Sequence, residues 1–227
     1  MNHPADESRW RRRKEARPAE LVAAAIELFV EKGFAATRLE EIAARAGVSK
    51  GTVYLYFSSK EELFKAAVRE GVVPHLAEVE RLIEKDTGSV ADLLRNILMT
   101  AWHVSGDSPV GGLPKLVVAE ARNFPDLARF YFDEVISRST RLFIVLLERG
   151  IQRGEFRPFD VKIMERIILA PFLMHIIWRH SLSCCEASPL SDESYATEAI
   201  ELILRGLRAD LVIADPKNTK PKGKKNA

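Results

Sequence analysis

The chain has 227 residues, of which 47% are hydrophobic and 29% charged, and its formal net charge is +2. These values are ordinary for a soluble globular protein. The charged N-terminus excludes a signal peptide, and the most apolar run, 163–178, is too short and too interrupted to cross a bilayer. We therefore expect no membrane partner. The two cysteines are adjacent and lack the spacing of zinc ligands, which favours a reduced, cytoplasmic protein with no metal.

Positive charge is concentrated at the two ends of the chain. Residues 9–17 carry six basic side chains and one acid, and residues 217–225 carry five lysines and no acid. Basic ends on an otherwise acidic chain can bind a polyanion such as DNA. We expect residues 1–17 to form a basic, flexible arm that either contacts DNA or is inert. Residues 213–227 are expected to form a disordered, lysine-rich tail.

The first expected helix begins near Pro18, since proline is tolerated in a first turn, and ends at Gly33. Its apolar residues recur at helical spacing and form a single stripe: Leu21, Ala24, Ala25, Leu28 and Phe29. This stripe predicts that the helix supports the two helices that follow it.

Residues 37–60 read as two short helices joined by a tight turn. Thr37 and Glu40 have the spacing of a capping box, Gly47 allows a left-handed helix end, and Ser49 is a suitable cap for the second helix. Such a pair predicts a helix-turn-helix, whose second helix enters the major groove of DNA. The alternative is an ordinary helical hairpin in a core. Against it, the second helix and its flanks are rich in donors: Ser49, Lys50, Thr52, Tyr54 and Lys60.

The remainder of the chain also has helical periodicity. A long helix is expected over 60–85, with a kink where Gly71 and Pro74 interrupt it. Caps and breaks predict further helices at 89–105, 112–122, 125–153, 160–182 and 191–210. No segment alternates as a strand does. The predicted fold class is therefore all-α, with about nine helices.

Residues 18–65 resemble the DNA-binding domain of the TetR (tetracycline-repressor) family of bacterial regulators. The resemblance rests on the stretches FVEKGF, AARAGVS and YLYFSSKEEL, which occur in this order. It implies an N-terminal three-helix helix-turn-helix domain at 18–63 and a C-terminal helical ligand-binding and dimerisation domain at 64–212. It also implies a small-molecule effector that changes the spacing of two recognition helices.

The same resemblance, carried over residue by residue, implies which side chains meet DNA. Thr37 and Arg38 would hold a phosphate at a helix N-terminus, and Tyr56 and Lys60 would contact the backbone on the far side. Gly51 costs a helix about 1 kcal/mol relative to alanine, which either reflects a close approach to DNA or is harmless in a first turn. The expected DNA-binding residues are Thr37, Arg38, Ser49, Lys50, Gly51, Thr52, Tyr54, Tyr56 and Lys60.

A single recognition helix covers half a site, so we expect a homodimer on a pseudo-palindromic operator, with its two helices about 34–36 Å apart. The last helix has an apolar stripe with small residues near its start, which is typical of a helix-bundle dimer. The alternative is that the stripe packs on its own domain. The expected dimer residues are Ala196, Ala199, Ile200, Ile203, Leu204 and Leu207.

Residues 75–182 combine large apolar side chains with a few polar ones, as a small-molecule site between helices does. Side chains that bring a hydrogen-bonding group to an apolar setting are the best candidates for such a pocket, although each is also a plausible core residue. The expected effector-pocket residues are Trp102, His103, Tyr131, Phe172, His175 and Trp178.

No catalytic motif is visible: the sequence has no HExxH pair, glycine-rich phosphate loop, G-x-S-x-G turn or Cys/His dyad. We therefore expect no enzyme and no cofactor. The predicted function is a ligand-responsive transcriptional regulator, a repressor that binds double-stranded DNA as a dimer and is released by a small, largely apolar effector. The alternative is a helical small-molecule or partner-binding module with no operative DNA reading.

Overall fold

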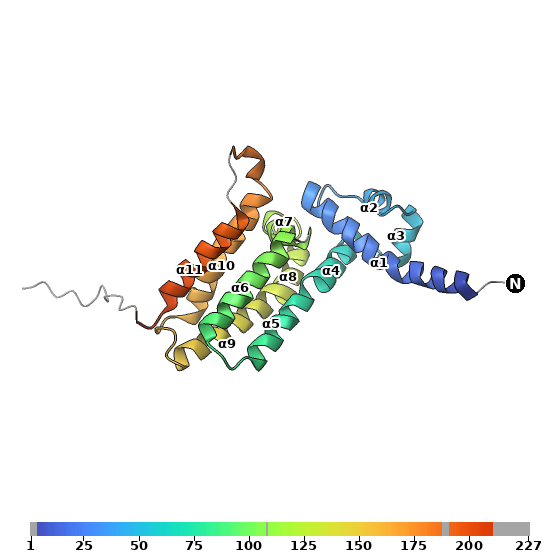
Figure 1. Cartoon of the computed structure of the whole chain (residues 1–227). Helices are drawn as coiled ribbons and strands as arrows, with labels where there is room; N and C mark the ends of the chain where they lie inside the picture. The colour runs from blue at the N-terminus through green and yellow to red at the C-terminus, as the bar shows by residue number, and fades with distance from the viewer. Residues whose placement is uncertain (1–3, 108, 188–190, 211–227) are drawn as a thin grey trace, which may run out of the picture.

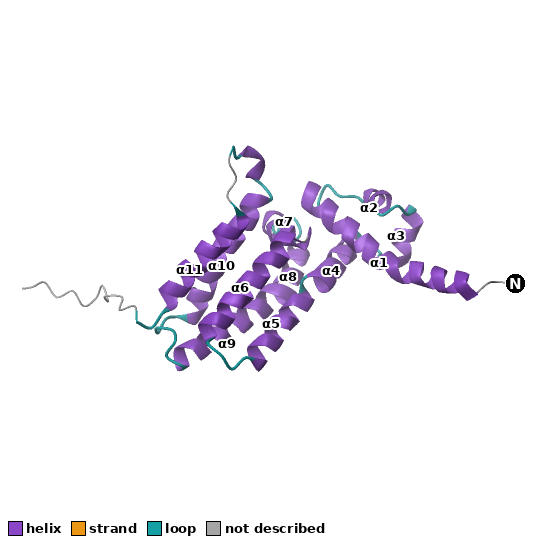
Figure 2. Cartoon of the chain, viewed as in Figure 1, coloured by secondary structure: helices purple, strands orange, loops and turns teal. Residues whose placement is uncertain are grey.

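The computed structural model describes residues 4–107, 109–187 and 191–210, and Figures 1 and 2 show that these residues are helical almost throughout. Across the described ranges the only β pairing is an isolated bridge between Phe156 and Arg208. The predicted all-α fold class is confirmed. No helix within these ranges combines the length and the apolar character needed to span a membrane. The predicted tail at 213–227 lies outside the described residues.

The helices are α1 (Pro4–Lys32), α2 (Leu39–Arg45), α3 (Lys50–Tyr56), α4 (Lys60–Gly71), α5 (Val73–Lys85), α6 (Val90–Asp107), α7 (Leu113–Glu120), α8 (Pro125–Tyr131), α9 (Ser137–Gln152), α10 (Val161–Arg179) and α11 (Asp192–Leu207). Short 3₁₀ turns η1 (Pro109–Gly112) and η3 (Ser183–Cys185) and a π-helical turn η2 (Phe132–Ile136) lie between them. Two of the nine expected helices are each divided in two. The break after Gly71 confirms the expected kink, and the wider π turn separates α8 from α9.

The first helix begins earlier than the sequence indicates. It runs continuously from Pro4, so that residues 4–17 extend α1 and Pro18 lies inside it. A proline inside a helix removes one backbone hydrogen bond, a cost that neighbouring turns can offset. The helix ends as expected, because Gly33 adopts a φ of +86°, in the left-handed region that favours glycine.

The predicted capping box at Thr37 and Glu40 is wrong by one residue. Arg38 is the N-cap of α2, and its backbone N–H donates to the Glu41 carboxylate at 3.1 Å. Thr37 is turned into the core, where 2% of it is exposed, and its hydroxyl donates to the Gly33 carbonyl at 2.8 Å. The helix therefore starts one residue later, because the threonine holds the preceding loop.

A first hydrophobic core joins the N-terminal helices to part of the C-terminal body. Phe29, Phe34 and Phe64 of the α1–α4 region pack in one buried cluster with Leu113 of α7 and Tyr131 of α8. The turn between α7 and α8 lies against the loop that follows α1. There the Glu120 carboxylate accepts a hydrogen bond from the Ala35 backbone N–H at 3.2 Å.

A second hydrophobic core lies in the body and excludes α1–α4. It is built from Ile83 of α5, Leu94 of α6, Leu146 of α9, Ile168 of α10 and Ile200 of α11. Figure 1 shows α5, α6, α9, α10 and α11 as a bundle of long helices, with α1–α3 grouped at the other end of α4. The helix α3, which is the second helix of the expected helix-turn-helix, thus lies at one end of the molecule, away from α11.

Candidate DNA interface, dimer surface and effector pocket

The helix α3 presents a continuous face to solvent. Ser49 caps it as predicted, because its hydroxyl oxygen accepts from the Thr52 backbone N–H at 3.2 Å. Val53 is fully buried and fixes the inner face. Tyr54 is 49% exposed and Leu55 is 73% exposed, so both side chains project from the outer surface. Sequence reasoning missed Leu55, which no polar pattern marks.

Lys50 and Glu40 form an ion pair across the outer surface of α2 and α3. This hydrogen bond lowers the pKa of the Glu40 carboxyl and raises the pKa of the Lys50 ammonium group. The Lys50 ammonium also lies 5.7 Å from the Tyr54 ring centroid. Both charged side chains are about half exposed. A phosphate that approaches Lys50 therefore competes with a carboxylate.

Gly51 lies at the exposed start of α3. A Cβ placed there would meet only the Ser49 hydroxyl oxygen, at an ordinary contact distance of 3.8 Å. Nothing within the folded chain therefore requires a glycine at this position.

The ammonium group of Lys60 is bound by backbone carbonyl groups of the protein itself. Its ammonium donates to the carbonyls of Phe34 at 2.8 Å and Ala35 at 3.1 Å, and it lies 3.4 Å from the carbonyl of Thr37. It also lies 4.6 Å from the Phe34 ring centroid and 5.6 Å from that of Phe124. Lys60 therefore holds the loop between α1 and α2 in place, a role that the sequence pattern did not predict.

The other expected DNA-binding residues divide by exposure. Arg38 is exposed at the start of α2, and Thr52 is half-buried on α3. Tyr56 is half-buried and packs against the first core. Thr37 is buried, with only 2% of the residue exposed. Of the expected DNA-binding residues, the structure thus exposes Arg38, Ser49, Lys50, Gly51 and Tyr54, half-buries Thr52, Tyr56 and Lys60, and buries Thr37.

The apolar stripe predicted as the dimer interface packs mostly on its own domain. Ala196, Ile200, Leu204 and Leu207 are each at most 7% exposed and belong to the second core. Ala199 and Ile203 are half-buried. For the four buried residues this corrects the expected interface, because a side chain enclosed by its own protomer has no surface left for a partner. Ala199 and Ile203 stay predicted interface residues.

A different apolar surface lies on the outside of α10 and α11, which run side by side in Figure 1. We call it the α10–α11 face. On α10, Ile163 is 59% exposed, Ile167 54% and Met174 51%, and on α11 Leu202 is 76% exposed. On its outer side α10 therefore carries a second apolar stripe, and α11 carries one exposed leucine. Sequence periodicity detects such stripes but does not say which of them faces the protomer's own core.

Part of the predicted effector pocket forms an aromatic cluster between α6, α10 and α11. The Trp102 ring centroid lies 5.8 Å from that of Phe172 and 4.7 Å from that of His175. Tyr195, which sequence reasoning missed, stacks on His175 at 4.5 Å and donates its hydroxyl to the Pro171 carbonyl at 3.0 Å.

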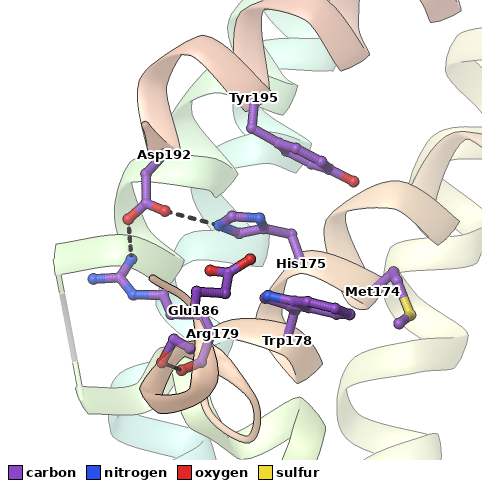
Figure 3. Close-up of a pocket in the computed structure, with 8 residues that line it drawn as sticks. Met174, His175, Trp178, Arg179, Glu186, Asp192 and Tyr195 are labelled. Carbon is purple, nitrogen blue, oxygen red and sulfur yellow. Dashed lines mark hydrogen bonds and ion pairs between the residues drawn. The ribbon is translucent and has the colours of Figure 1, made fainter. Parts of the chain in front are cut away.

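A cavity of 290 Å³ lies next to this cluster (Figure 3). Three of its polar side chains are joined, because Asp192 accepts from His175 Nε2 at 2.9 Å and from Arg179 at 3.0 Å. The lining is otherwise mainly apolar. The residues that line the cavity are Met174, His175, Trp178, Arg179, Ser183, Glu186, Asp192 and Tyr195.

Two of the expected pocket residues lie elsewhere. His103 is exposed on the surface of α6. Tyr131 is 6% exposed in the first core, where burial raises the pKa of its phenol. Of the predicted set, Trp102, Phe172, His175 and Trp178 lie at or directly behind the cavity. Two of the missed polar residues, Ser183 and Glu186, come from the connection between α10 and α11, where no periodic pattern exists to mark them.

Comparison with known proteins agrees with this geometry. The family of bacterial regulatory proteins, tetR family, matches residues 21–67, and the tetracyclin repressor-like C-terminal domain matches residues 84–183. An uncharacterized HTH-type transcriptional regulator, YfiR of Bacillus subtilis, is 31% identical over 147 residues, which are 64% of this chain and 70% of that protein. The HTH-type transcriptional repressor KstR2 of Mycolicibacterium smegmatis is 25% identical over 194 residues, which are 85% of this chain and 91% of that protein.

A solved structure has the same fold. The ketosteroid transcriptional regulator KstR2 of Mycobacterium tuberculosis superposes with a TM-score of 0.68 at 25% identity, covering 85% of this chain and 95% of that one. The matches favour a DNA-binding transcriptional regulator over a helical module with no DNA reading. With a capped recognition helix on its surface and both family domains matched in order, the chain belongs to the TetR family of bacterial regulatory proteins.

Proposed function

We propose that this regulator is a cytoplasmic repressor that binds a pseudo-palindromic operator as a homodimer and leaves it when a small, largely apolar effector binds. The observation that carries the proposal is the exposed face of α3, with Lys50, Gly51 and Tyr54 around a helix start capped by Ser49. A short helix with donors on its outer face and an apolar inner anchor fits a major groove.

Each part of this face has a distinct role. Arg38 and Lys50 neutralise phosphates and set the position of the protein on the duplex, while Tyr54 reads base edges. Leu55 is the most exposed apolar residue of α3 and offers a contact to a thymine methyl group. Lys50 leaves Glu40 when it binds a phosphate, so part of its binding energy is spent on breaking that pair.

The dimer forms through the α10–α11 face. Exposed Ile167 and Leu202, with half-buried Ala199, provide apolar area and a place for close helix approach. Gly206, also exposed on α11, has open space where a Cβ would stand. Two copies of this face form a four-helix contact whose two halves are the same surface.

The effector occupies the cavity beside Trp178 and Tyr195. Its apolar walls, with a few fixed polar groups, suit a ligand that has an apolar body and one polar end. The names of two relatives point the same way: one is the ketosteroid regulator named above, and the other is the fatty acid metabolism regulator protein of Bacillus subtilis, 27% identical over 158 residues.

Operator binding is tested by fluorescence anisotropy with duplexes from the region upstream of the coding sequence, at several salt concentrations. Wild type is expected to bind one duplex far more tightly than a scrambled duplex. Lys50→Ala is expected to reduce the salt slope by about 1, and Tyr54→Ala to cost about 1–3 kcal/mol. Lys85→Ala, at the exposed end of α5, is the control and should bind as wild type does. Equal affinity of wild type for specific and scrambled duplexes contradicts the proposal.

Gly51→Ala separates folding from DNA binding. Because the added methyl group makes only an ordinary contact with the Ser49 hydroxyl and alanine favours helix, the free energy of unfolding is expected to stay the same or to rise by up to about 1 kcal/mol. Operator affinity is expected to fall, because the Cβ holds the backbone away from the groove. Urea denaturation and the anisotropy titration measure the two effects. Unchanged affinity would assign Gly51 to the harmless first-turn alternative.

A further inference from the structure

The two cysteines form a feature that DNA binding does not use. Cys184 and Cys185 are the chain's only cysteines, and both are exposed free thiols. They lie in the turn η3, whose shape is fixed by a hydrogen bond from the Cys185 N–H to the Leu182 carbonyl at 2.9 Å. The Ser183 hydroxyl ties the same turn to the Arg179 carbonyl at 2.7 Å. The two sulfur atoms are 3.7 Å apart.

This separation suits a bridging atom better than a direct bond. Consecutive Cα atoms are about 3.8 Å apart, shorter than the roughly 4.4–6.8 Å of ordinary disulfides, so a disulfide between neighbours is strained. Two sulfurs that each lie about 2.3 Å from one pyramidal, three-coordinate atom are about 3.3–3.6 Å apart. The observed 3.7 Å therefore lies within a few tenths of an ångström of the span of two sulfurs on such an atom.

The number of protein side chains that could bind the bridging atom indicates which element it is. Among the described residues no group of three or more His, Cys, Asp and Glu side chains is arranged to hold a metal ion. Zinc sites are completed by three or four protein ligands, whereas trivalent arsenic that carries one organic group needs two thiols. We propose that Cys184 and Cys185 form a dithiol site for a mono-organyl arsenic(III) compound, with its organic group in the neighbouring cavity.

The reaction is a condensation without any change of oxidation state. In R–As(OH)₂ two As–O bonds break and two As–S bonds form, and each hydroxyl leaves as water with one thiol proton. Arsenic remains trivalent and no oxidant is needed. The hydrogen bond with Cys184 raises the pKa of the Cys185 thiol, which favours the protonated form of Cys185 that this condensation consumes. A divalent metal ion would instead require thiolates.

The cavity next to the turn can take the organic group. Ser183 and Glu186, the residues on either side of the cysteines, both line it. Met174 and Trp178 form its apolar wall, and its volume of 290 Å³ is large enough for a phenyl ring. Neither cysteine lines the cavity itself, so the substituent of an arsenical held by the two sulfurs has to extend past Ser183 or Glu186 to the apolar wall.

Phenylarsine oxide is the compound that tests the site, with the full chain and intact-mass spectrometry. Wild type is expected to take up one equivalent, to keep it in excess glutathione, and to release it to 2,3-dimercaptopropanol. In Cys184→Ser and Cys185→Ser the second sulfur is lost, and the apparent affinity should fall by about 10²–10⁴-fold. Thermal melts check that the variants are folded. If a single-cysteine variant holds the arsenical as wild type does, or wild type loses it to glutathione, the dithiol site is refuted.

The position of the organic group is tested by comparing phenylarsine oxide with methylarsine oxide. Trp178→Ala is expected to weaken the phenyl compound and leave the methyl compound unchanged. Leu182→Ala is the control, because Leu182 is exposed beside the turn and does not line the cavity. An equal effect of Trp178→Ala on both compounds would place the group outside the cavity. None of these measurements contains DNA, so the result is independent of operator binding.

Discussion

Leu202→Glu is expected to turn the dimer into monomers and to weaken operator binding by about 10²–10⁴-fold, the advantage that a second linked site normally provides. Leu202 is 76% exposed within its own protomer, so its replacement removes nothing from either core. In the proposed dimer, however, it faces its own copy, and two carboxylates would be brought together in an apolar contact. Light scattering measures the mass, and anisotropy measures the affinity.

The matched control is Val145→Glu, which introduces the same charge at a 45% exposed apolar residue of α9. It should remain a dimer with wild-type affinity, and both variants should melt near the wild-type temperature. A dimeric Leu202→Glu variant would mean that the α10–α11 face is not the interface. A monomer that still binds the operator at full affinity would mean that dimerisation is not needed for reading DNA.

Lys60→Met is expected to lower the free energy of unfolding by about 1.5–3 kcal/mol, the usual range for hydrogen bonds to a charged group. The ammonium of Lys60 is the donor for the Phe34 and Ala35 carbonyls, and methionine keeps the length of the side chain while it removes that donor. Operator affinity should fall because the loop before α2 loosens, but its salt slope should not change. Urea denaturation and the salt series measure these quantities.

Lys65→Met is the control for this experiment. Lys65 lies on the same helix, and its ammonium is paired with the Glu62 carboxylate at 2.9 Å in a partly exposed ion pair. Its loss should alter stability by less than about 1 kcal/mol. If Lys60→Met instead keeps full stability and reduces the salt slope by about 1, Lys60 is a phosphate contact, as the family pattern implies.

The elements near DNA were readable from the sequence because their signals are local. Ser49 as a cap, the helix end at Gly33 and the left-handed Gly47 each depend on a few neighbouring residues, and the structure confirms all three. The start of α2 was misplaced because Thr37 bonds backward to the Gly33 carbonyl. Thr37 and Arg38 are each followed three residues later by a glutamate, and only the packing of the loop shows which of the two is the N-cap.

The dimer surface and the pocket were harder to predict because they depend on long-range packing. Sequence periodicity does not say whether an apolar stripe of α11 packs on its own protomer or on a partner, so the prediction named the buried Ile200 and omitted the exposed Leu202. Tyr131 and Trp102 have the same amphipathic character, yet the fold places them in different cores. The role of Lys60 depends on carbonyl groups more than twenty residues away, which no motif encodes.

The chain passes between the two cores more than once, and this limits how such a regulator can be recombined. Residues 21–68 build the first core, 83–102 the second, 110–135 the first again, and 143–207 the second. No single junction therefore separates a DNA-reading half from a sensing half. A hybrid joined after α4 would leave Leu113 and Tyr131 facing a foreign surface. An exchange that keeps both cores intact needs more than one junction, so that the segment from η1 to η2 is exchanged together with the N-terminal helices.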